Sequence, residues 1–241
     1  MEPVLFYGVP QGCSLGSIVA LEWLGLPYRL CRIDRLQPTP EDRNDPGSTL
    51  NAHCKTPALL LNGSVLTESF AILSNLAARG VAKRLGFRQG APEHDRFNEM
   101  LAFLHTGFVG AFEPLWTANR LREPDERTRT LLRAQLRTLG RDNVRRHCAW
   151  LDGLLAERAW LLDGEERTLV DAYFAGVGRW IEHHMLFEVA REFPHLNRYQ
   201  YRLREDPAVQ FALAIEAGEQ VTSANFKGHV TLDELQPKLA A

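Results

Sequence analysis

The spacing of hydrophobic residues changes near residue 85, and this change divides the chain into two parts. Before it, short β-prone apolar runs alternate with helical patterns and with turns rich in glycine and proline. Asn62-Gly63 is the strongest hairpin signal in the chain. The predicted order is β-α-β, loop, β-β-α, with strands over 4–6, 28–33, 57–61 and 64–66 and helices beginning near 13 and 67.

Beyond a linker at 81–92, apolar residues recur every three or four positions nearly throughout, which predicts helices. One helix is expected along the apolar positions from 97 to 115, and a second, long helix over about 124–158. The expected buried stripe of the long helix consists of Leu132, Leu136, Leu139, Cys148, Leu151 and Leu155. Thr168 and Asp171 have the spacing of a capping box, with Asp in place of the usual Glu. They predict the start of an apolar, fully buried helix over 172–181.

These patterns predict an α/β domain followed by an all-α domain. The expected bounds are 1–82 for the first domain and 90–218 for the second. The tail, 219–241, has weak periodicity, so it either covers the body of the protein or is mobile.

Composition and charge narrow the class of protein. The 241 residues are 45% hydrophobic and 24% charged, which is ordinary for a soluble globular chain with a sizeable core. The net charge of −2 gives no reason to expect nucleic acid or an acidic membrane as a partner. We find no signal peptide or membrane-spanning run, and the four cysteines lack the spacing of a disulfide framework or a zinc site. A cytoplasmic protein without a metal is expected.

Cys13 stands where the first strand, a turn and a helix follow one another. Gly8, Pro10 and Gly12 make the turn, and the apolar stripe of the helix begins at Leu15. Free amide groups and the positive end of the dipole converge at a helix N-terminus, so a thiol there is expected to have a lowered pKa. Taken alone, the stretch also fits a helix-start residue without chemistry.

Glu68 and Ser69 stand at a second junction between a strand and a helix. A carboxylate at this place can hold an ammonium group, and the serine hydroxyl with free amides can hold a carboxylate. The alternative is an acidic residue that only complements the helix dipole.

Three signatures, in the right order, resemble those of glutathione S-transferases, most closely the bacterial cysteine-containing beta class. They are YGVPQGCSLGSIVAL, then KTPALLL with LTES, then WLL with TLVDAY and a later PAV. The resemblance covers about residues 2–217. It implies the glutathione transferase fold, in which a thioredoxin-like N-terminal domain precedes an all-helical C-terminal domain.

The resemblance also implies a binding site for glutathione as co-substrate. Pro57 is expected to be a cis-proline, and the exposed backbone of Thr56 to pair with the cysteinyl part of glutathione. Lys55 is expected to reach the glycyl carboxylate, and Glu68 and Ser69 to hold the γ-glutamyl end. His53 is a second candidate for that carboxylate, and both residues fit solvated loop charges nearly as well.

Three side chains near the helix start are candidates for activating the thiol of glutathione. Cys13 comes first because it matches the beta-class cysteine. Ser14 is second, since hydroxyl donors serve other classes of the family, and Tyr7 is third. The alternative for Tyr7 is a strand-end aromatic in the core.

The chain departs from the beta class where that class carries a His-Lys pair before a Phe-x-Pro-Leu run. The nearest candidates are His105 and Thr106, one turn earlier, so the polar contact from the second domain is expected to be missing or differently supplied. An open, apolar substrate pocket is expected instead, lined by Phe108, Phe112 and Trp116. Plain core packing is the alternative for these aromatics.

The leading hypothesis is a homodimeric detoxification enzyme that activates the glutathione thiolate for attack on a hydrophobic electrophile. A second is a glutathione-dependent thiol–disulfide reductase that uses Cys13. A third is a non-catalytic binding protein with the same fold.

Overall fold

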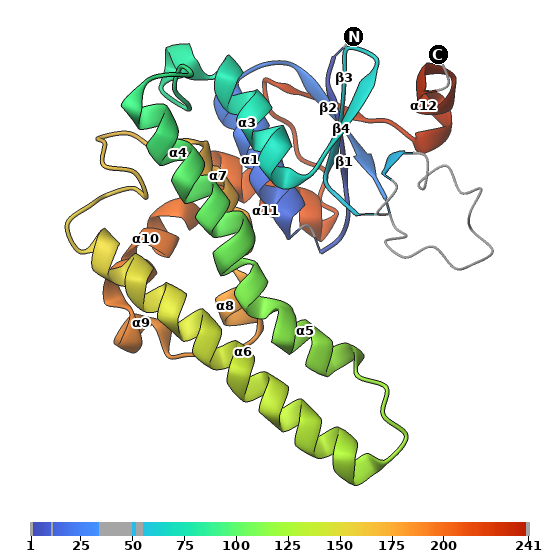
Figure 1. Cartoon of the computed structure of the whole chain (residues 1–241). Coiled ribbons are helices and arrows are strands. Elements are labelled where there is room, and N and C mark those ends of the chain that lie inside the picture. The colour runs from blue at the N-terminus through green and yellow to red at the C-terminus, as the bar shows by residue number, and fades with distance from the viewer. Residues whose placement is uncertain (1, 11, 34–49, 52–54, 240–241) are drawn as a thin grey trace.

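The computed structural model describes residues 2–10, 12–33, 50–51 and 55–239. Five strands form one mixed sheet in the order β4-β3-β1-β2-β5 (Figure 1). Pairing is parallel between β1 and β2 and between β2 and β5, and antiparallel between β1 and β3 and between β3 and β4. The strands are β1 (Val4–Tyr7), β2 (Tyr28–Arg32), β3 (Ala58–Leu61), β4 (Ser64–Thr67) and β5 (Phe226–His229).

The strands alternate their side chains between two buried faces. On one face, Leu5 and Tyr7 join a core with α1 (Cys13–Leu24) and α3 (Ser69–Arg79). On the other face, Val4 and Phe6 pack in a smaller cluster that includes Leu235. Apolar residues on both faces explain why the strands read as continuous hydrophobic runs rather than as an alternating pattern.

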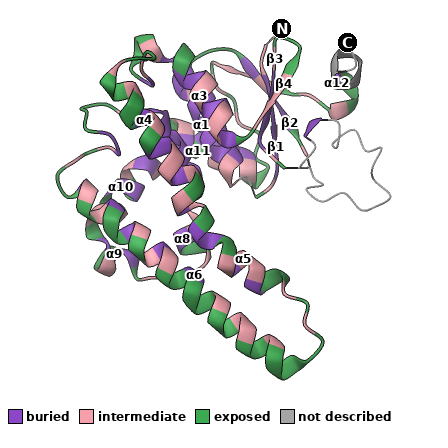
Figure 2. Ribbon diagram, in the orientation of Figure 1, coloured by how far each residue is buried: buried purple, intermediate pink, exposed green. Residues whose placement is uncertain are grey.

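Helices make up most of the chain from residue 81 to 217, as the spacing predicts. Figure 2 shows buried residues concentrated along α1 and along the two helices that pack against it, α7 (Leu169–Val177) and α11 (Pro207–Ala217). The elements are η2 (Val81–Lys83), α4 (Pro92–Ala102), η3 (Phe103–Phe108), η4 (Gly110–Phe112), α5 (Glu113–Arg120), α6 (Glu126–Leu155), α7 (Leu169–Val177), α8 (Trp180–His183), α9 (Val189–Glu192), α10 (Pro194–Arg204) and α11 (Pro207–Ala217).

The capping box predicted before the buried helix is present at the start of α7. Thr168 is the N-cap residue, and its backbone N–H donates to the Asp171 carboxylate at 2.7 Å. Asp171 also accepts hydrogen bonds from the Leu161 amide and from the Tyr199 hydroxyl, at 3.0 and 2.6 Å. All nine residues of α7 are buried, so this carboxylate anchors a helix in the middle of the protein.

Two features of the fold differ from a simple reading of the sequence pattern. The tail covers the body of the protein, which is one of its two expected placements, and despite its weak periodicity it adds β5 to the edge of the sheet and forms α12 (Leu232–Leu239). The signal for α12 is a second capping box, in which the Thr231 amide donates to the Glu234 carboxylate at 2.7 Å. In the long helix α6, Leu139 was expected in the buried stripe and is 52% exposed.

Candidate functional site

Cys13 is the first residue of α1, as predicted. Gly12 before it has φ 46°, a left-handed conformation that glycine adopts without strain. The Cys13 side chain is half-buried, whereas Cys31 and Cys148 are buried. Among the described cysteines, Cys13 is therefore the one best placed to meet a ligand.

The Thr56–Pro57 peptide bond is cis, as the resemblance implies. Pro57 is buried, Thr56 is half-buried and Lys55 is exposed. The Asn51 side-chain amide donates to the Lys55 carbonyl at 2.9 Å and so stabilises the turn before Pro57. His53 lies outside the described residues.

Glu68 and Ser69 stand at the start of α3, the helix that follows the β3–β4 hairpin. Glu68 has φ 68°, a conformation that is rare and costly for a residue with a side chain. Its side chain is exposed, while Ser69 is 5% exposed at the first position of the helix. Such strain persists where the surrounding structure fixes it, which is common at ligand sites.

A tyrosine from the helical region provides the polar contact to the Cys13 sulfur. The Tyr173 hydroxyl lies 3.7 Å from the Cys13 Sγ and 3.0 Å from the His105 Nδ1. The three side chains therefore form a chain of polar contacts, and Ser69 is close enough to influence the pKa of both Cys13 and Tyr173. Sequence reasoning missed Tyr173, although it lies in the third family signature; nothing in the periodicity separates it from a core aromatic.

His105 reaches this place through an irregular turn. The single helix expected around residues 97–115 is interrupted by η3, a π-helical segment that contains His105. A π-turn adds a residue to the helical repeat and turns the following side chains, and such turns are frequent at functional sites. The polar contact from the second domain, expected to be missing or differently supplied, is thus supplied by Tyr173 with His105 behind it.

Two glycines bring Tyr173 to the sulfur. A Cβ atom added at Gly176 would lie 2.6 Å from the Gly12 carbonyl oxygen, and one at Gly16 would lie 2.8 Å from the Tyr173 Cα. The backbones of α1 and α7 therefore touch directly. This close approach fixes the distance between Cys13 and Tyr173.

The expected lowering of the Cys13 pKa is not found. Burial is the largest effect and raises the pKa of the Cys13 thiol, while hydrogen bonds from Tyr173, Ser69 and the Cys13 amide oppose it. The nearby Glu68 carboxylate also raises the pKa of this thiol. Without ligand, the thiol is therefore the favoured form. Burial likewise raises the pKa of Tyr173 well above its ordinary value.

Ser14 and Tyr7 are poorly placed to activate a thiol. Ser14 is fully buried, and its Oγ has no hydrogen-bond partner among the described residues. The Tyr7 hydroxyl lies 2.9 Å from the His229 Nε2, so it is engaged with the tail.

Phe108 and Phe112 are fully buried, which corrects the expectation that they line an open pocket. Phe112 packs against Trp116 and Trp180 at centroid distances of 6.1 and 5.5 Å. Trp116 is half-buried, and a Cβ atom added at Gly12 would lie 3.2 Å from the Trp180 ring. The aromatic surface beside the Cys13 turn is therefore Trp180 and its neighbour Trp116. Sequence reasoning missed Trp180, because no motif or spacing singles it out.

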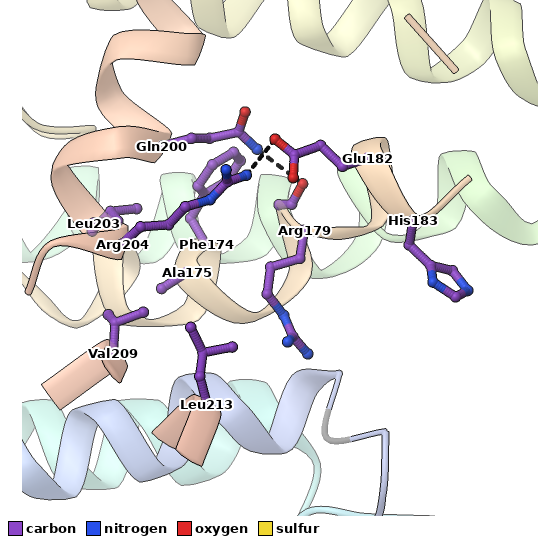
Figure 3. Close-up of a pocket in the computed structure, with 11 residues that line it drawn as sticks. Phe174, Ala175, Arg179, Glu182, His183, Gln200, Leu203, Arg204, Val209 and Leu213 are labelled. Carbon is purple, nitrogen blue, oxygen red and sulfur yellow. Dashed lines mark hydrogen bonds and ion pairs between the residues drawn. The ribbon is translucent and has the colours of Figure 1, made fainter. Parts of the chain in front are cut away.

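A separate cavity of about 260 Å³ lies among α7, α8, α10 and α11 (Figure 3). Two of its lining residues, Arg204 and Glu182, pair with each other, and Arg179 pairs with Glu216, which does not line the cavity. It contains none of the predicted site residues. Within the described part of the chain, no cluster of His, Cys, Asp or Glu has the geometry to hold a metal ion, and no helix is long and apolar enough to cross a membrane.

The order of the strands and helices and the position of Cys13 are those of the glutathione transferase fold. A glutathione S-transferase complexed with glutathione, from a sphingomonad, superimposes with a TM-score of 0.72 at 26% identity, over 89% of this chain and 98% of that one. The beta-class enzyme of Sphingomonas chungbukensis gives 0.72 at 28% identity, over 88% and 98%.

Sequence comparison places the chain within a family. A family model for the glutathione S-transferase N-terminal domain matches residues 12–79. Glutathione S-transferase GstA of Escherichia coli O157:H7 is 30% identical over 217 residues, which cover 88% of this chain and 98% of that protein. The chain therefore belongs to the glutathione S-transferase family of enzymes.

Proposed function

We propose that this protein binds glutathione beside Cys13 and activates its thiol for attack on a hydrophobic electrophile. The observation that carries this proposal is the polar chain from Cys13 through Tyr173 to His105, which adjoins Ser69. It brings hydrogen-bonding groups from both halves of the protein to one sulfur position. The cis turn at Pro57 and the family membership support a glutathione ligand at this place.

In this proposal the three parts of glutathione meet different residues. The backbone of Thr56 pairs with the cysteinyl unit like an added strand. Glu68 takes the α-ammonium group, and Ser69 with the first amides of α3 takes the α-carboxylate. The exposed Lys55 reaches the glycyl carboxylate. This arrangement places the ligand sulfur at the start of α1.

The proposed reaction is a nucleophilic displacement or addition. The thiol of glutathione loses its proton through the Tyr173 hydroxyl towards His105, and the sulfur then forms a bond to carbon. In a displacement, the bond to the leaving group breaks and that group departs with the electron pair. The amides of the α1 N-terminus and the Tyr173 hydroxyl stabilise the thiolate, while Trp116 and Trp180 offer an apolar surface to the electrophile.

Disulfide reduction is the second candidate, and it is supported by the half-buried position of Cys13, since Cys31 and Cys148 are buried. Its thiolate attacks a mixed disulfide of glutathione, releases the reduced substrate thiol and keeps glutathione bound as a disulfide. A second glutathione then releases the enzyme cysteine as glutathione disulfide. The three described cysteines are free thiols, which supports a reducing compartment such as the cytoplasm.

Two assays and two variants separate these activities. Turnover of a generic aryl halide with glutathione measures conjugation, and turnover of a mixed disulfide measures reduction. We expect Cys13→Ser to abolish reduction and Tyr173→Phe to weaken conjugation. If the wild-type protein neither turns over these substrates nor is retained on immobilised glutathione, both enzyme functions are wrong and a non-catalytic role follows.

We also propose that the protein is a homodimer that uses the face between α4 and α6. Trp150 on this face is 48% exposed, and its ring lies 4.5 Å from that of Phe103. Both line a hollow of about 600 Å³. Light scattering on the purified protein tests the mass, and Trp150→Glu is expected to shift a dimer towards monomer.

A further inference from the structure

The C-terminal tail reaches the same end of the sheet as Cys13. In Figure 1 the chain leaves α11, returns to the sheet and adds β5 beside β2. Because β1, β2 and β5 run parallel, the C-terminal ends of these three strands lie at the same end of the sheet. The turn that leads to Cys13 follows β1 at that end of the sheet.

The first contact of the tail is with Tyr7, the last residue of β1. The Tyr7 hydroxyl is inside the protein, since Tyr7 is 2% exposed, and it lies 2.9 Å from the His229 Nε2. A buried phenol needs a hydrogen-bond partner, and β5 supplies one. His229 therefore fixes the end of the strand that leads into the Cys13 turn.

The second contact is with the segment before the cis turn. Leu235 of α12 is 2% exposed and belongs to the same buried cluster as Leu50, Ala58 and Leu60. Leu50 precedes Asn51, whose side chain donates to the Lys55 carbonyl at 2.9 Å. Contacts thus run from the tail helix to the backbone expected to pair with glutathione.

The tail is held by specific bonds along its length. The Tyr28 amide donates to the Asn225 carbonyl at 3.1 Å, and the Val230 amide to the Leu30 carbonyl at 2.9 Å. The Ser223 hydroxyl donates to the Glu22 carboxylate at 2.7 Å. These bonds give the tail one defined position on the domain.

We propose that the tail is a positioning element of the glutathione site, with His229 holding the Cys13 turn and Leu235 holding the cis-proline turn. This inference rests on the proposed function, because the ligand it serves is glutathione. His229 contacts Tyr7, and Leu235 packs in the cluster with Leu50, so the two residues act through Tyr7 and through Leu50, Asn51 and the Lys55 carbonyl. Misplacing either turn weakens binding of glutathione more than binding of the electrophile.

The kinetic test compares three variants of the full chain. His229→Ala and Leu235→Ala are expected to raise KM for glutathione by about tenfold, with KM for the aryl halide and kcat changed far less. Lys227→Ala is the matched control, since Lys227 is an exposed residue of the same strand. His229→Gln keeps a hydrogen-bonding group for Tyr7 and is expected to restore most of the glutathione affinity.

Cys31 reports on the tail without any substrate. It is fully buried in the cluster that contains Leu235, so alkylation of Cys31 in the folded protein is expected to be slow. Leu235→Ala is expected to speed it severalfold, whereas Lys227→Ala is expected to leave it unchanged. This measurement shows whether the tail has been loosened.

The outcomes separate this inference from the proposed function. If the wild-type enzyme uses glutathione and the loosened variants keep its KM, the tail inference is wrong while the function stands. If the wild-type protein does not bind glutathione, the function fails, and hydrogen exchange decides the positioning claim. Faster exchange at 4–7 and 55–61 in His229→Ala and Leu235→Ala, but not in Lys227→Ala, then supports it; unchanged exchange overturns it.

Discussion

Two tyrosines near Cys13 each pair with a histidine, yet only one of them reaches the sulfur. Tyr173 comes from the helical region and lies between Cys13 and His105. Tyr7 comes from β1 and faces His229 of the tail. Both rings are buried, and their distances to histidine, 3.0 and 2.9 Å, are nearly equal.

The difference between them lies in what positions each hydroxyl. Tyr173 is fixed by direct backbone contact between α1 and α7, which leaves no room for adjustment. Tyr7 is fixed through a strand added at the edge of the sheet. We infer that residue type near a cysteine does not decide which group acts on it; packing does.

The largest expected effect comes from separating α1 and α7. Gly176→Ala places a methyl group 2.6 Å from the Gly12 carbonyl oxygen, so the helices must move apart. We expect a loss of roughly 3 kcal/mol in the free energy of unfolding, measured by chemical denaturation, and loss of activity. Gly153→Ala is the control: Gly153 is exposed in α6 with open space around it, so this change should stabilise by about 0.5–1 kcal/mol.

Removing the hydroxyl of Tyr173 and that of Tyr7 in separate variants tests whether only Tyr173 acts on the sulfur. Tyr173→Phe deletes the donor to the sulfur and should lower kcat for conjugation about 100-fold. Tyr7→Phe should leave kcat nearly unchanged and act mainly on KM for glutathione. Equal losses of kcat in the two variants would show that the assignment of Tyr173 is wrong.

Alkylation of Cys13 by a neutral reagent measures how far its thiol is ionised at each pH. Because burial raises the pKa of this thiol, the alkylation rate should still be rising with pH above about 9, where an exposed thiol is already largely ionised. Tyr173→Phe removes a hydrogen bond that lowers the pKa of Cys13, so its rate curve should move to higher pH. Mass spectrometry at Cys13 measures both curves, and a shift to lower pH would contradict the contact.

The smallest expected effect is on stability at alkaline pH. Burial raises the pKa of Cys148 to about 12 in the folded protein, and thiols in the unfolded chain ionise near 8.5. Between these values the unfolded state holds fewer protons, so this thiol contributes a loss of stability as pH rises. Cys148→Ala should therefore flatten the fall of Tm above pH 8.5, after allowance for the small cavity it leaves.

Local patterns in the sequence were enough for much of the fold. The hairpin at Asn62-Gly63, the capping box at Thr168 and the helix starting at Cys13 are each set by neighbouring residues. The tail escaped prediction because β5 is stabilised by pairing with β2, which lies almost 200 residues earlier. The break in the helix around His105 escaped as well, because apolar residues recur every three or four positions from 97 to 115 and this spacing does not mark the π-turn.

By itself, the sequence determined the family resemblance and the place of Cys13 at a helix start, which depend on short local motifs. The cis-proline turn followed only from that resemblance. Only the tertiary structure decided that Tyr173 contacts the Cys13 sulfur and that Tyr7 faces away from it. The physical reason is that a hydroxyl's partner depends on packing between distant segments: here Gly16 against α7, and β5 against β2.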